Sequence, residues 1–162
     1  MTDDQVHSAM VRWLRGLTGV TVIKSHQSGP APAGSYVSVN LTTTRQVREW
    51  AQSFDYDAED TSGAVATSPL LEIEWQFSCH AYGEEPMGIL RPVRSAIQLA
   101  QMHEPLLPDL VIHECSQIRN VPDWLNERWE PRAQMDIFVR GLTRDGFDID
   151  VIEQARFDLE RD

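Results

Sequence analysis

Hydrophobic residues near the start of the chain recur every three or four positions. They are Val6, Met10, Trp13, Leu14 and Leu17. This spacing places them on one face of an amphipathic helix. Thr2 and Gln5 have the spacing of a capping box, and glycine, found here at position 19, commonly ends a helix. The pattern predicts a helix that begins just after Thr2 and ends near Gly19.

Alternating apolar and polar residues, which are typical of half-buried strands, follow this helix. Residues 20–24 and 36–42 predict two strands of one sheet, separated by the Gly/Pro-rich segment 26–34. The longest alternating run predicts a strand over residues 71–80. One of its faces carries Leu71, Ile73, Trp75, Phe77 and Cys79. We expect that face in the core and the polar face in water or at an interface.

The second half of the chain predicts one more helix and further strands. The helix begins near Pro86, and Pro92 is compatible with it only in the first turn, where no helical hydrogen bond is lost. The strands are expected at residues 110–118 and 132–142. The last stretch fits either a terminal strand over residues 147–152 or a short helix, and we favour the strand. Residues 49–68 and 119–131 show neither periodicity. We predict a long, mobile loop for the first and an ordered loop for the second.

Together these elements predict an α+β protein. Its sheet is mainly antiparallel with four to six strands, and two helices pack on one face. A chain of 162 residues is close to the usual size of one domain, so residues 1–162 are expected to form a single domain. Within it, residues 147–162 are expected to be an extended C-terminal strand or a tail.

The charge of the chain disfavours nucleic-acid binding. The sequence holds 25 acidic and 14 basic residues, with a formal net charge of −11, and the basic residues are dispersed. Such a surface repels phosphate backbones. The acidic start MTDDQ lacks the positive charge of a secretory signal, and no apolar run approaches the length of a membrane span. We therefore expect a protein of the cytoplasm with no membrane contact.

The residues that could carry chemistry lack the spacing of known catalytic or metal sites. At most three of them, Cys79, His113 and Cys115, could lie on one face of the sheet. They lack the closely spaced ligand pairs of structural zinc sites. Glu72 and Glu74 resemble nuclease carboxylates, but the required lysine is missing, and they are more simply the solvent face of a strand. We expect no metal, no cofactor and no enzymatic activity.

Four acidic residues gather in the segment predicted as a mobile loop: Asp55, Asp57, Glu59 and Asp60. Such a cluster is most often a solvated loop. The alternative is that it faces a DNA-conducting channel or a protein partner. The sequence leaves both interpretations open.

Four stretches of the chain share a pattern with one family of viral proteins. They are VRWLRGLTG in the first helix, VIKSHQSGPAPAGSYVSVNL across the first two strands, EIEWQFSCHAYG before the second helix, and WEPRAQMDIFVR near the end. The most specific part has the form H-Q-x-G-P-x-P-x-G-x-Y-V, from His26 to Val37. Across residues 11–140 the chain resembles the neck or tail terminator proteins of tailed bacteriophages.

This resemblance implies a structural virion protein, assembled in the host cytoplasm and located in the neck or tail. It implies a homo-oligomeric ring, expected to be a hexamer, that caps the tail tube protein and joins it to the head connector or completion protein. Double-stranded DNA would pass through without specific binding. The candidate contacts with a neighbouring subunit or the tube are His26, Gln27, Pro30, Pro32, Arg45, Arg48 and Arg140.

Other functions stay open on the sequence alone. A head-completion or tail-completion connector subunit is also a small α+β ring former. A nuclease or deaminase would use the scattered histidine, cysteine and carboxylate side chains. An acidic DNA mimic would need carboxylates spaced like phosphates along one face, which the dispersed arginines disfavour.

Overall fold

The computed structural model describes residues 1–57, 64–125 and 127–150 of the chain. The helices are α1 (Asp3–Thr18), α2 (Pro86–Ala96) and the 3-10 helix η1 (Ala100–Leu106). One sheet contains β1 (Thr21–Lys24), β2 (Tyr36–Gln46), β3 (Ser53–Asp57), β4 (Ala64–Tyr82), β5 (Leu110–Cys115), β6 (Arg119–Asn120), β9 (Arg132–Arg144) and β10 (Phe147–Asp150). A separate hairpin is formed by β7 (Asp123–Leu125) and β8 (Arg128–Glu130).

The long strand β4 is the centre of the sheet. It pairs antiparallel with β2 on one side and with β9 on the other, and β5 extends the sheet beyond β9. The predicted α+β class is confirmed, but the described part of the sheet has eight strands rather than four to six. The sheet is also mixed, because β1 runs parallel to β2. The helix η1 is an addition to the two predicted helices.

The first helix forms as the sequence predicts, with both ends fixed by local hydrogen bonds. The Gln5 backbone N–H donates to the Thr2 hydroxyl at 3.3 Å, and the Thr2 N–H donates to the Gln5 side chain at 2.9 Å. Gly19 ends the helix with a φ of 69°. The apolar stripe of α1 packs on the sheet in a core with these fully buried members: Val6, Met10, Leu14, Val37, Val39, Trp75, Phe77, Leu90, Val93, Met135 and Ile137.

The connection between β1 and β2, residues 25–35, explains the cluster of glycines and prolines before β2. Because the two strands are parallel, the chain must return by about 13 Å, the length of β1, before it enters β2. Gly29 and Gly34 have φ values of 145° and 77°, in the region that favours glycine. The first role of this segment is therefore to reverse the chain.

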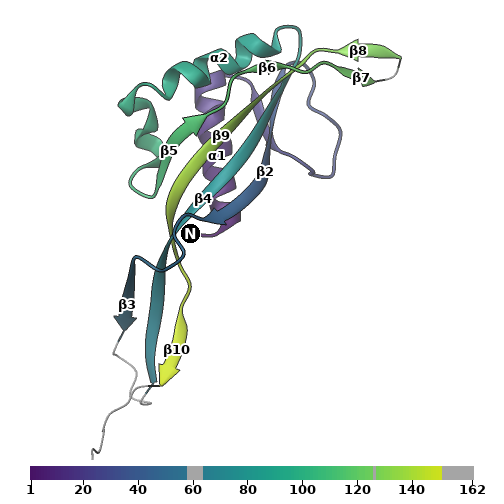
Figure 1. Ribbon diagram of the computed structural model, residues 1–162. Coiled ribbons are helices and arrows are strands. Elements are labelled where there is room, and N and C mark those ends of the chain that lie inside the picture. The colour runs from purple at the N-terminus through teal and green to yellow at the C-terminus, as the bar shows by residue number, and fades with distance from the viewer. Residues whose placement is uncertain (58–63, 126, 151–162) are drawn as a thin grey trace, which may run out of the picture.

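Beyond the helices, β4 continues into a projecting ribbon that we call the arm (residues 53–57, 64–70 and 147–150). In the arm, β3 pairs with one edge of β4 and β10 with the other. Figure 1 shows the arm extending away from the helices, while the β7–β8 hairpin projects at the opposite end of the sheet. The fold therefore has a helix-covered body and two uncovered projections.

Two segments predicted as loops contain strands instead. The prediction of a long, mobile loop over residues 49–68 is wrong, because residues 53–57 form β3 and residues 64–68 belong to β4. Residues 58–63 lie outside the described part. The predicted ordered loop over 119–131 contains β6, β7 and β8. These strands are held by pairing, β3 with β4, β6 with β9 and β7 with β8, and they are too short for an alternating pattern to reveal them.

Smaller differences concern α2 and the late strands. The helix begins at Pro86 as predicted, but Pro92 lies in its interior, where its missing N–H removes one helical hydrogen bond. The burial of Leu90 and Val93 against the sheet holds the helix in place. The edge strand β5 is shorter than predicted. The terminal strand is confirmed over residues 147–150, and the rest of the predicted strand or tail, residues 151–162, lies outside the described residues. No helix in the described ranges is long and apolar enough to cross a membrane.

Gly141 in β9 marks a close approach between the sheet and the chain that enters β5. A Cβ at this position would lie 2.6 Å from the Asp109 carbonyl oxygen and 3.2 Å from the Trp75 ring. We expect Gly141→Ala to lower the free energy of unfolding by about 2 kcal/mol, because backbone and a core ring must move. Urea unfolding followed by tryptophan fluorescence measures the change.

Gly16 in α1 is the matched control, because a Cβ there meets no atom within 4 Å. Gly16→Ala is expected to raise the free energy of unfolding by about 0.5 to 1 kcal/mol through its higher helix propensity. Equal destabilisation by both changes would contradict the close approach at Gly141.

Candidate interaction surfaces

The sheet face that the helices leave open carries a row of charged residues. Arg45 of β2, Glu74 of β4 and Arg140 of β9 stand directly opposite one another in the strand register. Their immediate neighbours Trp75 and Val139 point into the core, so the row lies on the opposite face. Glu74 is therefore flanked by a guanidinium group on each side.

Glu74 is almost fully buried, with only 2% of its side chain exposed. Its Oε1 accepts a hydrogen bond from Arg45 Nε at 2.6 Å, and its Oε2 accepts one from Arg140 Nε at 3.0 Å. The Nε2 atom of His113 in β5 lies 2.7 Å from Glu74 Oε2. His113 lies on this face because it follows Ile112, which points into the core, and a β-bulge between Ile112 and Glu114 shifts the register with β9 at this point.

These contacts favour the ionised form of Glu74. The loss of water around the carboxylate acts to raise its pKa, but hydrogen bonds from Arg140, Arg45 and His113 outweigh that cost and hold the pKa below its usual range. The cluster links four neighbouring strands through one negative charge. We call Arg45, Glu74, His113 and Arg140 the charge cluster.

The prediction that Glu72 and Glu74 form a solvent face is wrong for Glu74. Alternation shows which face of a strand a residue occupies, but not whether long side chains of the neighbouring strands cover it. Glu72 is closer to the surface: its Oε2 lies 3.2 Å from Arg48 Nε and 3.0 Å from Gln52 Nε2.

Each of the three arginines expected at a subunit seam pairs with a glutamate of its own chain. Arg45 and Arg140 bind Glu74, and Arg48 binds Glu72. Arg45 and Arg48 are still 64% and 66% exposed, so their remaining N–H groups can donate to another molecule. A contact with a second subunit stays a prediction.

The expected contact residues before β2 lie in a different place. His26, Gln27 and Pro30 are exposed and Pro32 is half-buried, and they line an open hollow of about 570 Å³ beside the ends of β2 and β4. His80 also lines it, and burial, followed by the nearby charge of Arg132, lowers the pKa of this histidine. Tyr82 also lines the hollow and is eight residues from Glu74 along β4, or about 26 Å. The structure therefore separates the contact residues before β2 from the three arginines.

The acidic candidates lie at the arm. Asp55 is in β3 and its Oδ2 lies 3.3 Å from Arg144 Nε, while Asp57 is the last residue of that strand. Glu59 and Asp60 lie outside the described residues. Their role beside a DNA channel stays a prediction.

Sequence reasoning missed the exposed aromatic side chains of the two projections. In the arm, Phe54, Tyr56 and Phe147 are 54%, 64% and 58% exposed. In the hairpin, Trp124 and Trp129 are also exposed and form a T-shaped pair with ring centroids 5.1 Å apart. The available signal was the alternation of apolar and acidic residues in SFDYD and FDID. Exposed apolar clusters of this kind mark surfaces that contact other proteins.

The cysteine and histidine candidates for a metal site do not come together. Cys79 is buried in the core, where burial raises the pKa of its thiol, whereas His113 contacts Glu74 on the opposite face of the sheet. Within residues 1–57, 64–125 and 127–150, no three histidine, cysteine or acidic side chains are grouped so that they could hold a metal ion.

The fold combines an α+β body with two exposed apolar projections of the kind found at protein–protein interfaces. The sequence model of the phage neck terminator protein family matches residues 4–162, and the chain belongs to this family. It is thus a structural tail terminator, a component of the virion neck or tail. The match confirms the resemblance seen over residues 11–140 and extends it to almost the whole chain. No curated protein matches the chain.

A solved structure with a similar fold is the PVC sheath/tube terminator of an extracellular contractile injection system, in the extended state. The TM-score is 0.57 at 14% sequence identity. The match covers 99% of this chain and 64% of that chain, so this chain spans less than two thirds of the other protein's length. The likeness shows that the two proteins share a fold.

The charge cluster gives a stability prediction. Replacing Glu74 by Gln removes the charge that Arg45 and Arg140 share, and hydrogen bonds to a charged group contribute about 1.5 to 3 kcal/mol. We expect the free energy of unfolding at pH 7 to fall by about 2 kcal/mol, measured by urea unfolding. Glu72→Gln is the control, because its pair with the exposed Arg48 should contribute less than about 1 kcal/mol.

The same variant predicts a pH dependence. Because the pKa of Glu74 is lowered in the folded protein, its stabilising contribution is fully present above the ordinary pKa of a glutamate, 4.5, and is lost as the pH falls through the lowered pKa. The stability difference between the wild-type protein and Glu74→Gln should therefore shrink between pH 5 and pH 3. A difference that stays constant over this range would contradict an ionised Glu74.

Proposed function

We propose that this terminator acts as a homo-oligomeric ring, a hexamer, that caps the tail tube and joins it to the head connector. In this role the protein is architectural and catalyses no reaction. The observation that carries the proposal is the family match over residues 4–162, together with aromatic surfaces that the isolated chain leaves in water.

The placement of these surfaces supports a ring. A closed ring needs two different contact patches on each copy, because each subunit meets its two neighbours through opposite sides. The arm and the β7–β8 hairpin project at opposite ends of the sheet, and both carry exposed aromatic residues (Figure 1). The two ends of each copy therefore differ, which is the asymmetry that head-to-tail contacts require.

The net charge supports passage of DNA without binding. Six copies with a net charge of −11 carry −66. At physiological salt, repulsion between charges extends only about 8 to 10 Å, so an acidic wall acts on DNA only when the duplex comes close. The inner wall of the ring is expected to hold acidic side chains such as Asp55.

Mass measurement combined with negative-stain microscopy tests the proposal. The purified chain, alone or mixed with tail tubes, is expected to give closed rings of six copies, located at tube ends. Light scattering gives the number of copies, and the images give their location.

A strict monomer in the presence of tubes would overturn the ring proposal. Rings that bind the portal side of the head but never tube ends would instead favour a head-completion subunit. Added duplex DNA serves as the control for the charge argument, because it should not change the mass of the assembly at physiological salt.

A further inference from the structure

The arm has two chemically different faces, which follow from its strand register. Tyr56 of β3 and Phe147 of β10 both pair with Thr67 of β4, so these three residues share one face. Phe54 and Ile149 lie on the same face, two positions along each strand. The acidic residues of β3 and β10, including Asp55 and Asp148, alternate with them. One face of the arm is therefore aromatic and the other is acidic.

The aromatic face of the arm continues the core face of β4 beyond the point where the helices cover it. The start of α1 is fixed there by the Trp75 indole N–H, which donates to Asp3 Oδ1 at 2.7 Å. Past this point the rings of Phe54 and Tyr56 are in contact with each other, with centroids 6.3 Å apart, but remain largely in water. Thr67 lies on the same face, and its hydroxyl is buried without a hydrogen-bond partner among the described residues. Exposed apolar faces of this kind are surfaces that a partner protein can cover.

The body offers a groove of matching chemistry between α1 and η1. The groove holds about 500 Å³ and is lined mainly by apolar side chains, among them Ala9, Trp13, Leu17, Met102 and Pro105. The Trp13 indole N–H donates to the Met102 carbonyl at 2.6 Å and so fixes η1 beside α1. Aromatic rings pack well against such a surface, including the sulfur of Met102.

The charges of the two surfaces are complementary. Arg12 lines the groove, Arg15 lies one turn further along α1, and neither has an ion-pair partner among the described residues. The arm is acidic overall: Asp55 and Asp148 are exposed on the face opposite the aromatic one, so they attract the groove's arginines at a distance rather than by direct pairing, and Asp55 also contacts Arg144 of its own chain at 3.3 Å. A guanidinium group at the groove rim can also stack on the Phe54 or Tyr56 ring. Attraction and stacking therefore act in the same direction.

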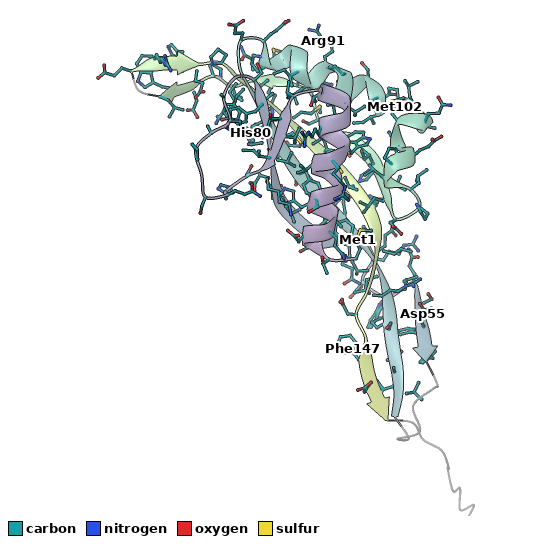
Figure 2. All side chains as sticks on the ribbon, turned by 180° about the vertical axis from the view of Figure 1, so that it is seen from behind. Met1, Asp55, His80, Arg91, Met102 and Phe147 are labelled. Atoms are coloured by element: carbon teal, nitrogen blue, oxygen red, sulfur yellow. The ribbon has the colours of Figure 1, made fainter. Side chains whose placement is uncertain are left out.

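We infer that the aromatic face of the arm docks into the α1–η1 groove of a second copy of this chain. The occupant is another copy because the arm projects away from its own groove: Figure 2 places Phe147 in the arm and Met102 in the body, well apart in the view. Every copy then offers one arm and one groove, as a head-to-tail ring requires. The inference rests on the proposed self-assembly and specifies its contact.

Disulfide trapping tests this contact directly. Tyr56→Cys and Gln101→Cys are made separately in a Cys115→Ser background, since the remaining Cys79 is fully buried. Gln101 lines the groove and is exposed. After mild oxidation, a mixture of the two variants should give a cross-linked dimer that neither variant gives alone. Val111→Cys, at an exposed position in β5 outside the groove, replaces Gln101→Cys in the control mixture and should give none.

The other outcomes overturn the docking inference, the terminator ring or both. Rings in micrographs without the mixed cross-link overturn the docking inference and leave the proposed function standing. Cross-links in the Tyr56→Cys sample alone indicate arm-to-arm contact and also overturn it. The mixed cross-link in particles that never bind tube ends supports the docking and overturns the terminator ring. The absence of both rings and cross-links would overturn the docking inference and the proposed function together.

A substitution at the groove rim gives an independent measurement. Arg12→Ala should raise the protein concentration needed for half-maximal assembly about tenfold, while the free energy of unfolding stays unchanged. Arg91→Ala, in α2 away from the groove, is the matched control for an exposed arginine and should leave assembly unchanged (Figure 2). Equal effects of the two variants would overturn the role of Arg12.

Discussion

The core face of β4 must be covered, and the helices cover only part of it. Along the body, α1 and α2 cover Trp75, Phe77 and Cys79 on the core face of β4. The hydrogen bond between Trp75 and Asp3 marks where α1 begins, and past it the strand continues with the same face bare. A single hydrogen-bonded ladder thus runs from the helix-covered body into an arm whose apolar face is exposed.

The opposite face of the sheet is left open by the helices and carries the charge cluster. The charge cluster around Glu74 satisfies a buried carboxylate with side chains from β2, β5 and β9, at the cost of removing that charge from water. This arrangement stabilises the sheet without apolar packing on that side. The contacting pairs of exposed aromatic rings lie at the arm and the β7–β8 hairpin, while Val111 and Leu142 are exposed on the charged face.

This division of surfaces suits a phage neck terminator. A protein that assembles needs a body that folds alone and contact surfaces that stay exposed until a partner arrives. Membership of the family gives the chain its structural role in the virion. The aromatic arm, the α1–η1 groove and the acidic overall charge then provide the chemistry from which we propose the ring, its contacts and its tolerance of passing DNA.

The sequence by itself determined the elements whose stabilising contacts are local. The Thr2 cap, the apolar stripe of α1 and the alternation around Trp75 specify a helix and a strand without distant partners. Only the tertiary structure decided that Glu74 is buried, that the segment around Tyr56 is a strand, and that the aromatic rings of the arm share a face. Those outcomes depend on which strands become neighbours, and cross-strand contacts leave no fixed spacing in the chain for periodicity to reveal.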